Sequence, residues 1–73
     1  MEIKQKFGLV IRELRIQKGV SQERLALDAD IDRTYIGHIE KGTRNVSIEI
    51  AEKLATYFQM PISELFRMVE KKN

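Results

Sequence analysis

With 73 residues, the chain has room for one domain and one small hydrophobic core. It contains no cysteine, which excludes disulfide bridges and thiolate zinc sites, and its 42% apolar content is too high for a disordered chain. The net charge of +2 is only mildly basic, and no apolar run approaches the roughly 20 residues that span a bilayer.

Apolar residues at helical spacing predict five helices and no strands, in one domain over residues 1–73. The first helix is expected from about Gln5 to Lys18. Gly19 ends it, because glycine readily adopts the left-handed conformation found after helices. The apolar side chains of this helix recur at helical spacing: Phe7, Val10, Ile11 and Leu14.

The second helix is expected to begin after Ser21, a good N-cap residue, and to end near Ala29. Glu23 in its first turn suits the positive end of a helix. Residues 30–32 form the turn to the third helix. Aspartate tolerates left-handed backbone better than most residues, and Asp32 is placed to cap the third helix.

The third helix is expected over about residues 33–41, with Gly42 after it. Ser47 precedes the fourth helix, and Pro61 separates it from a fifth that starts near Ile62 and runs into the lysine-rich tail. The residues expected to face inward on the fourth helix are Ile48, Ala51, Leu54, Ala55 and Phe58. The apolar side of the fifth helix is made by Leu65, Phe66 and Val69.

One face of the third helix carries mixed polar chemistry. At roughly 100° per residue, an arc of about 140° collects Arg33, Thr34, Gly37, His38 and Lys41. The opposite arc holds Tyr35, Ile36 and Ile39, so the two isoleucines anchor the helix to a core. The polar face offers a guanidinium, a hydroxyl, an imidazole and an ammonium group, which suit base edges and phosphates in a DNA major groove.

Gly37 lies in the middle of this polar face. A glycine inside a helix costs roughly 1 kcal/mol relative to alanine, and it allows another surface to approach closely. The alternative for Gly37 is a small residue that is merely tolerated. The alternative for the whole face is an ordinary solvated surface.

Two short helices joined by about three residues are typical of a helix-turn-helix, here at about residues 21–41, whose second helix enters the major groove. Ser21 and Gln22 begin the first helix of the pair, where free N–H groups attract anions. After the pair, Lys41 and Arg44 lie in a stretch without acidic residues. This loop is a second candidate for phosphate contact, and the alternative is a solvated loop.

The segment KGVSQERLALDADIDRTYIGHIEKGTRN resembles the helix-turn-helix of the Cro and XRE-type repressors, the lambda-repressor-like domain. The matching features are Gly19, Ser21-Gln22, Leu25-Ala26, Ile31, Ile36, Ile39-Glu40, Gly42 and Leu65-Phe66. The resemblance covers roughly residues 7 to 66 and implies an all-α, compact five-helix fold. Within the family, DRTYIGHIEKGTRNVS is most similar to the controller proteins of restriction-modification systems, small dimers that regulate their own gene and the endonuclease gene.

The resemblance implies roles for particular side chains. Base contacts are expected from Arg33, Thr34 and His38, with Gly37 at the base edges. Contacts to the DNA backbone are expected from Ser21, Gln22, Tyr35, Lys41, Arg44 and Asn45. The helical angles place Tyr35 off the polar face, so packing and phosphate contact at the rim both stay open for it. The resemblance also implies an ion pair between Arg15 and Glu40, against the alternative of two unrelated surface charges.

Three positions depart from the family pattern. Asp30 and Gln59 stand where glycine is common, so the loop at Gln59 is expected to differ. Tyr57 stands where a small residue is usual, which indicates a partner or a repacked surface.

A homodimer is expected because one helix in one groove touches few base pairs. The last two helices carry more apolar residues than one small core needs. The expected interface residues are Ile50, Tyr57, Ile62, Leu65, Phe66 and Val69. The alternative is that all of them lie in the core of the monomer.

Other functions fit less well. The aspartates of DADID start like a calcium loop, but Arg33 replaces the required glycine and Ile39 the required glutamate. His38 is the only histidine, and no catalytic constellation stands out, so no metal, cofactor or enzyme activity is expected. A protein-interaction module of the antitoxin or anti-repressor type and a phage-type repressor remain as alternatives.

The expected function is therefore a sequence-specific regulator of transcription that binds double-stranded DNA. RNA polymerase is named as a further candidate partner, and no membrane partner is expected. The first residues, MEIKQKF, lack the apolar region of a signal peptide, so the expected location is the cytoplasm, at the nucleoid.

Overall fold

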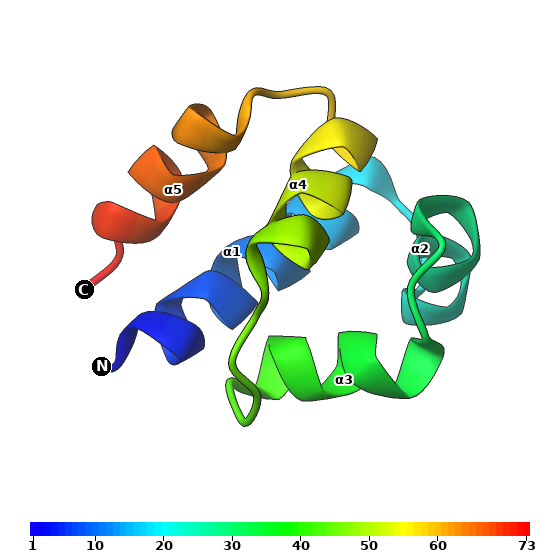
Figure 1. Cartoon of the computed structure of the whole chain (residues 1–73), viewed down its shortest axis with the longest axis horizontal. Coiled ribbons are helices and arrows are strands. Elements are labelled where there is room, and N and C mark those ends of the chain that lie inside the picture. Colours follow the sequence, from blue (N-terminus) through cyan, green and yellow to red (C-terminus); the bar gives the residue numbers. More distant parts are fainter.

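Five α-helices and no strands make up the computed structural model, which describes residues 1–73 (Figure 1). The helices are α1 (Ile3–Lys18), α2 (Gln22–Ala29), α3 (Arg33–Lys41), α4 (Ile48–Tyr57) and α5 (Ile62–Glu70). The all-α, five-helix prediction is confirmed. In Figure 1, α3 lies along the base of the molecule, α2 stands at its right, and α5 lies at the upper left beside α1. No helix is both long and apolar enough to cross a bilayer.

The ends of the helices follow their capping residues. The side-chain oxygens of Ser21, Asp32 and Ser47 each accept a hydrogen bond from a backbone N–H in the first turn of the helix that follows, as the sequence predicts. The first helix begins at Ile3, earlier than expected. The cause is a capping box, in which Glu2 and Gln5 bond to each other's backbone N–H groups.

Asp30 and Gln59 both adopt left-handed backbone, with φ 58° and 60°. Asp30 therefore takes a conformation that aspartate tolerates better than most residues, at the end of α2. Gln59 adopts a conformation that favours glycine. The expectation that the loop at Gln59 differs from the family pattern stays a prediction.

The core contains fourteen buried apolar residues, drawn from all five helices and from Ile31 in the turn. Leu65 and Val69 belong to this core and are 0% exposed. The prediction that they face a partner is wrong, because they lie on the inner side of α5, which packs against α1 and α4. Ile50, Tyr57 and Ile62 are half-buried around the core.

Two other apolar residues also differ from expectation. Ile48 was expected to face inward, but it is 81% exposed. The first turn of α4 meets the core through Ala51, which is 1% exposed, and through the half-buried Ile50, while Ile48 at the very start of the helix lies beyond the covered surface. Phe66 is 39% exposed, and its ring lies 5.7 Å from that of Phe7. Phe58, at the end of α4, is half-buried.

Gly8 lies in the middle of α1 and faces the end of α3. A Cβ atom at this position would lie 2.1 Å from the carbonyl oxygen of Ile39 and 3.0 Å from that of Glu40. No pair of atoms can approach so closely without bonding, so α1 and the backbone of α3 can touch only because residue 8 has no side chain. This contact fixes where α3 lies on the body of the protein.

Candidate nucleic-acid interface

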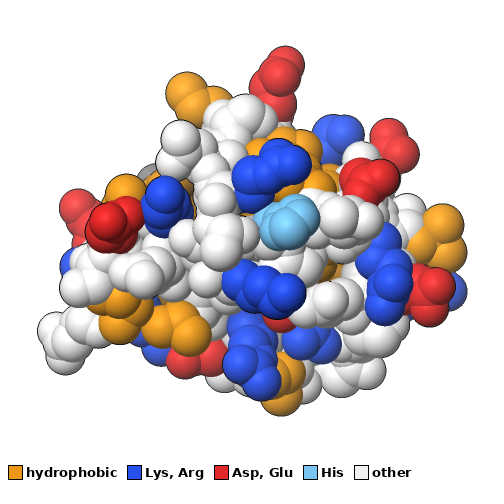
Figure 2. Space-filling model, turned by 90° about the horizontal axis from the view of Figure 1, so that it is seen from below, with side chains coloured by type: hydrophobic (Ala, Val, Ile, Leu, Met, Phe, Trp, Pro, Cys, Tyr) orange, Lys and Arg blue, Asp and Glu red, His pale blue; other side chains and the backbone are white.

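The outward side of α3 presents a continuous polar surface, which we call the α3 face. It is made by Arg33, Thr34, Gly37, His38 and Lys41. On the inward side, Ile36 and Ile39 are 0% and 1% exposed and hold the helix to the core. Figure 2 looks at this face and shows lysine and arginine side chains gathered around the single histidine. The predicted residues therefore lie together on one accessible surface.

The loop after α3 is held against this face by two side chains. The Thr43 hydroxyl donates a hydrogen bond to the His38 carbonyl oxygen at 3.2 Å, and it lies 3.4 Å from the His38 ring. Tyr35 donates from its hydroxyl to the Asn45 carbonyl oxygen at 3.0 Å, while the Arg44 guanidinium lies over the Tyr35 ring, 5.5 Å from its centre. Tyr35 therefore packs against the loop that follows α3, and its contact with a phosphate stays a prediction.

The start of α2 lies beside the α3 face. Ser21 is exposed, and its hydroxyl oxygen is occupied by the capping bond from the backbone N–H of Arg24. Gln22 is half-buried, and its amide nitrogen donates to Glu40 at 3.0 Å. The start of α2 is therefore tied to α3 by the bond from Gln22 to Glu40, and the amide nitrogen of Gln22 is already bonded within the protein.

Arg15 and Glu40 form an ion pair that ties α1 to α3. Arg15 donates from Nε to Glu40 Oε2 at 2.7 Å and from a terminal nitrogen to Oε1 at 3.1 Å. The side chains are 15% and 4% exposed, respectively. The hydrogen bond to Glu40 raises the pKa of Arg15, against the opposing effect of burial. Because Glu40 also accepts from Gln22, one carboxylate joins α1, α2 and α3.

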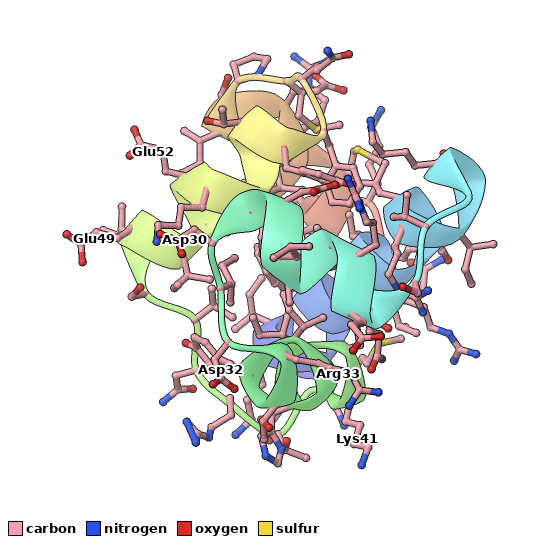
Figure 3. All side chains as sticks on the ribbon, turned by 90° about the vertical axis from the view of Figure 1, so that its right-hand side faces the viewer. Asp30, Asp32, Arg33, Lys41, Glu49 and Glu52 are labelled. Atoms are coloured by element: carbon pink, nitrogen blue, oxygen red, sulfur yellow. The ribbon has the colours of Figure 1, made fainter.

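Charges are unevenly distributed around α3. Figure 3 shows Arg33 and Lys41 projecting from α3 at the base, with Asp32 at the start of the same helix, whereas Asp30, Glu49 and Glu52 lie higher, on the side of the turn and α4. The Asp32 carboxylate accepts hydrogen bonds from the backbone N–H groups of Thr34 and Tyr35, so the outward side of α3 beyond it presents cationic and neutral groups to an anion. No three histidine or carboxylate side chains lie close enough together to hold a metal ion.

Gly37 has free space around it on the α3 face. Outside the backbone of α3 and the two neighbouring residues, the only heavy atom within 4 Å of a Cβ placed there is Gln22 Oε1, at 3.7 Å, which is an ordinary contact distance. The packing of the protein therefore does not require glycine at this position, in contrast to Gly8. If glycine is required at position 37, the requirement comes from a partner that approaches this face and not from the packing of the chain.

The two helical glycines give a matched prediction. Gly8→Ala should lower the free energy of unfolding by about 1–3 kcal/mol, because the new methyl group overpacks α1 against α3. Gly37→Ala should raise it by up to roughly 1 kcal/mol, the difference in helix propensity. Urea unfolding of both variants and the unsubstituted protein measures these changes. Shifts in the same direction would contradict the packing described for α1 and α3.

The Tyr57 side chain packs against other residues of the same chain. Its hydroxyl donates to Asp28 at 3.3 Å, and the Lys18 ammonium lies 5.0 Å from the centre of its ring. Burial raises its pKa, and the nearby Asp28 carboxylate adds to this effect. Tyr57 thus links α4 with α2 and the end of α1, and this use within the chain argues against a place for it in a dimer interface.

Sequence reasoning missed Gly8, Thr43 and the bond from Gln22 to Glu40. A glycine among the apolar positions of the first helix was a visible signal for the close approach at Gly8. Thr43 and the bond from Gln22 depend on how the loop and α2 lie against α3, and no local pattern encodes that.

Known proteins match this chain over most of its length. A helix-turn-helix family model matches residues 11–65. The chain is 44% identical to control protein C.MunI of a Mycoplasma species over 71 residues, which are 96% of each chain. It is 50% identical to control protein C.BamHI of Bacillus amyloliquefaciens over 50 residues, 67% of this chain and 62% of that one.

Two solved structures have the same fold. The restriction-modification controller protein C.AhdI of Aeromonas hydrophila gives a TM-score of 0.81 at 49% identity, covering 86% of this chain and 96% of that one. The restriction-modification controller protein C.Esp1396I, solved as a tetramer with its natural 35 base-pair operator, gives a TM-score of 0.86 at 34% identity, covering 97% and 93%. The chain therefore belongs to the Cro/XRE-type helix-turn-helix family of DNA-binding transcriptional regulators, together with the restriction-modification controller proteins.

Proposed function

We propose that this regulator reads an operator through the α3 face, as a homodimer, and that it controls a restriction-modification system. The observation that carries the proposal is the arrangement of α3 itself. Buried isoleucines hold one side of the helix to the core, and base-reading and phosphate-binding groups fill the other. The similarity to restriction-modification controller proteins supports the further proposal that this protein controls such a system.

Three side chains of the α3 face are suited to base edges. Arg33, at the first position of α3, presents a forked pair of donors that matches guanine O6 and N7. Thr34 offers a hydroxyl and a methyl group, which suit several bases and the thymine methyl. His38 lies one turn further along, where its ring and the bonded Thr43 reach the next base pair.

Phosphate contacts flank these bases on both sides. Lys41 and Arg44 follow the polar face, with Arg44 held over the Tyr35 ring and Asn45 exposed beside it. At the other side, Ser21 and the free N–H groups at the start of α2 suit a second phosphate. Tyr35 acts here as the support of Arg44.

A dimer follows from the geometry of DNA. Two-fold dimers of this motif place their recognition helices roughly 34 Å apart, one turn of the double helix. The molecule extends 28 × 24 × 22 Å, so two copies in side-by-side contact span about one such turn. We place the contact near the end of α3, and the relative C.Esp1396I, solved as a tetramer in complex with its operator, supports self-association on DNA.

An apolar groove of about 170 Å³ lies in that place, and we call it the Ile3 groove. It is lined by Ile3, Lys4, Phe7, Asn45, Val46 and Phe66. In Figure 1, the N-terminal end of α1 lies at the lower left, with α5 above it and the loop after α3 at the bottom. Ile3 is 61% exposed and Phe66 39% exposed, so a partner copy has apolar surface to cover. Of the interface residues expected from the sequence, the proposed interface includes Phe66 but not Tyr57.

Ile3→Glu should convert the dimer into a monomer, because a charge would then enter the apolar interface. The variant should stay folded, because a carboxylate at the first position of a helix is favourable. Sedimentation at high micromolar concentration measures the change. Leu27→Lys is the control, since Leu27 is 71% exposed on α2, away from the groove, and lysine suits the end of that helix. A wild-type monomer, or a dimer of Ile3→Glu, would contradict this interface.

Selection from a random duplex library at roughly physiological salt tests the proposed function. Recovery of a near-palindromic motif supports a dimeric, sequence-specific regulator. Weak binding with no recovered motif would favour the protein-interaction module, which the same fold also allows.

Two expectations stay predictions that depend on operator binding. A DNA-bound regulator acts at the nucleoid, within the cytoplasm. Contact with RNA polymerase would need a surface left open on DNA, and the side that carries Glu49 and Glu52 meets that requirement (Figure 3). Unchanged transcription in vitro with Glu49→Lys and Glu52→Lys variants that still bind DNA would count against this contact.

A further inference from the structure

The amide of Gln22 has a fixed orientation. Its nitrogen donates to Glu40 Oε1 at 3.0 Å. A carboxylate that is bonded to Arg15 is ionised and can only accept, so the NH₂ group of Gln22 must face Glu40. The amide oxygen then necessarily points the other way, towards Gly37, and it accepts no hydrogen bond from the protein.

Gly37 makes this oxygen accessible from the α3 face. Gln22 Oε1 lies 3.7 Å from the position that a Cβ of residue 37 would occupy. A group that touches the bare backbone at Gly37 therefore comes within reach of Oε1. Neighbouring turns of α3 carry Arg33 and Lys41, so the opening lies in the middle of the surface presented to DNA. The missing side chain of Gly37 leaves a gap beside Gln22 Oε1. This oxygen is held in one orientation and lacks a partner, so it suits a hydrogen-bond donor on a flat ligand.

We propose that Gln22 reads a base, through the gap at Gly37, by accepting a hydrogen bond from an exocyclic amino group. In the major groove, only adenine N6 and cytosine N4 present such donors, whereas guanine and thymine present acceptors. The operator should therefore require adenine or cytosine at one position of each half-site, opposite Gly37. This inference rests on operator binding through the α3 face, and it gives Gln22 a different role from the backbone contact that the family resemblance implies.

Two variants separate this role from others. Gln22→Leu removes the acceptor, and Gly37→Ala leaves it in place but covers it with a methyl group. Both variants, the unsubstituted protein and the control Gln17→Leu on the exposed side of α1 would be put through the same duplex selection. Gly37→Ala should melt at a higher temperature than the unsubstituted protein, so that any change in its DNA binding is not loss of folding.

The preference for adenine or cytosine should fall roughly fivefold at the same position in both variants, as expected for one hydrogen bond between neutral groups. The other positions should be unchanged, and Gln17→Leu should recover the original motif. Replacing that base by an analogue without the exocyclic amine should lower the affinity of the unsubstituted protein for the operator about fivefold. The affinities of Gln22→Leu and Gly37→Ala should not change.

Three results would overturn the inference. Equal weakening of every sequence by both variants would place Gln22 on a backbone phosphate. An unchanged preference would mean that its oxygen meets no base. Failure of the unsubstituted protein to recover any motif would overturn the proposed function itself, and this inference with it.

Discussion

Replacing Glu40 with alanine is expected to lower the free energy of unfolding by about 3–5 kcal/mol, the usual effect of removing one partner of a buried ion pair. The Glu40 side chain is 4% exposed and accepts bonds from Arg15 and Gln22. Without it, the guanidinium of Arg15, 15% exposed, stays charged in a poorly solvated place. Its remaining protein acceptor is the Val20 carbonyl oxygen.

Thermal unfolding followed by circular dichroism measures this effect. For a domain of this size the melting temperature should fall by at least about 12 °C. Glu49→Ala is the control, because Glu49 is exposed on α4 and takes part in no ion pair. Glu40→Gln should lose less than Glu40→Ala, since its amide oxygen can still accept one bond from Arg15. A normal melting temperature for Glu40→Ala would mean that the pair is not buried in solution.

The second large effect concerns salt. If Lys41 and Arg44 of each copy contact phosphates, a dimer neutralises about four of them, and the slope of log affinity against log salt should be about −3.6. Affinity should then fall roughly a hundredfold between 50 and 200 mM salt. Cations released from the DNA cause this loss, so it should occur on specific and non-specific duplexes alike.

Arg44→Ala tests whether Arg44 is one of the phosphate contacts that produce this slope. Two contacts per dimer are lost, so the slope should become shallower by about 1.8. Binding should weaken on all sequences alike, because Arg44 contacts no base in this account. Arg67→Ala on α5, far from the α3 face, is the matched control and should leave the slope unchanged. Binding that is indifferent to salt would contradict phosphate contact altogether.

Local chemistry is what made the helix-turn-helix predictable from the sequence. Ser21 and Asp32 mark the starts of α2 and α3, Gly42 marks the end of α3, and the helices begin and end where these residues indicate. The division of α3 into an apolar and a polar side follows from helical periodicity in the same way.

The sequence pattern does not show which surfaces of the helices pack against one another. Periodicity places Leu65 and Val69 on one side of α5, but it does not say whether that side meets the protein's own core or another copy. The same limit applies to Ile48, whose phase matches the core although nothing covers it. Gly8 and Gln22 act through contacts between helices that are distant in sequence, and these contacts exist only once the fold is formed.

The central claim is that the α3 face reads bases, and the most direct measurement is the base preference of Arg33→Ala. Its affinity would be compared with that of the unsubstituted protein on a selected operator carrying each of the four bases at every position. The account predicts a loss of about 1–3 kcal/mol of discrimination at one position of each half-site, with other positions unchanged. An unchanged preference, or equal weakening at all positions, would contradict the claim.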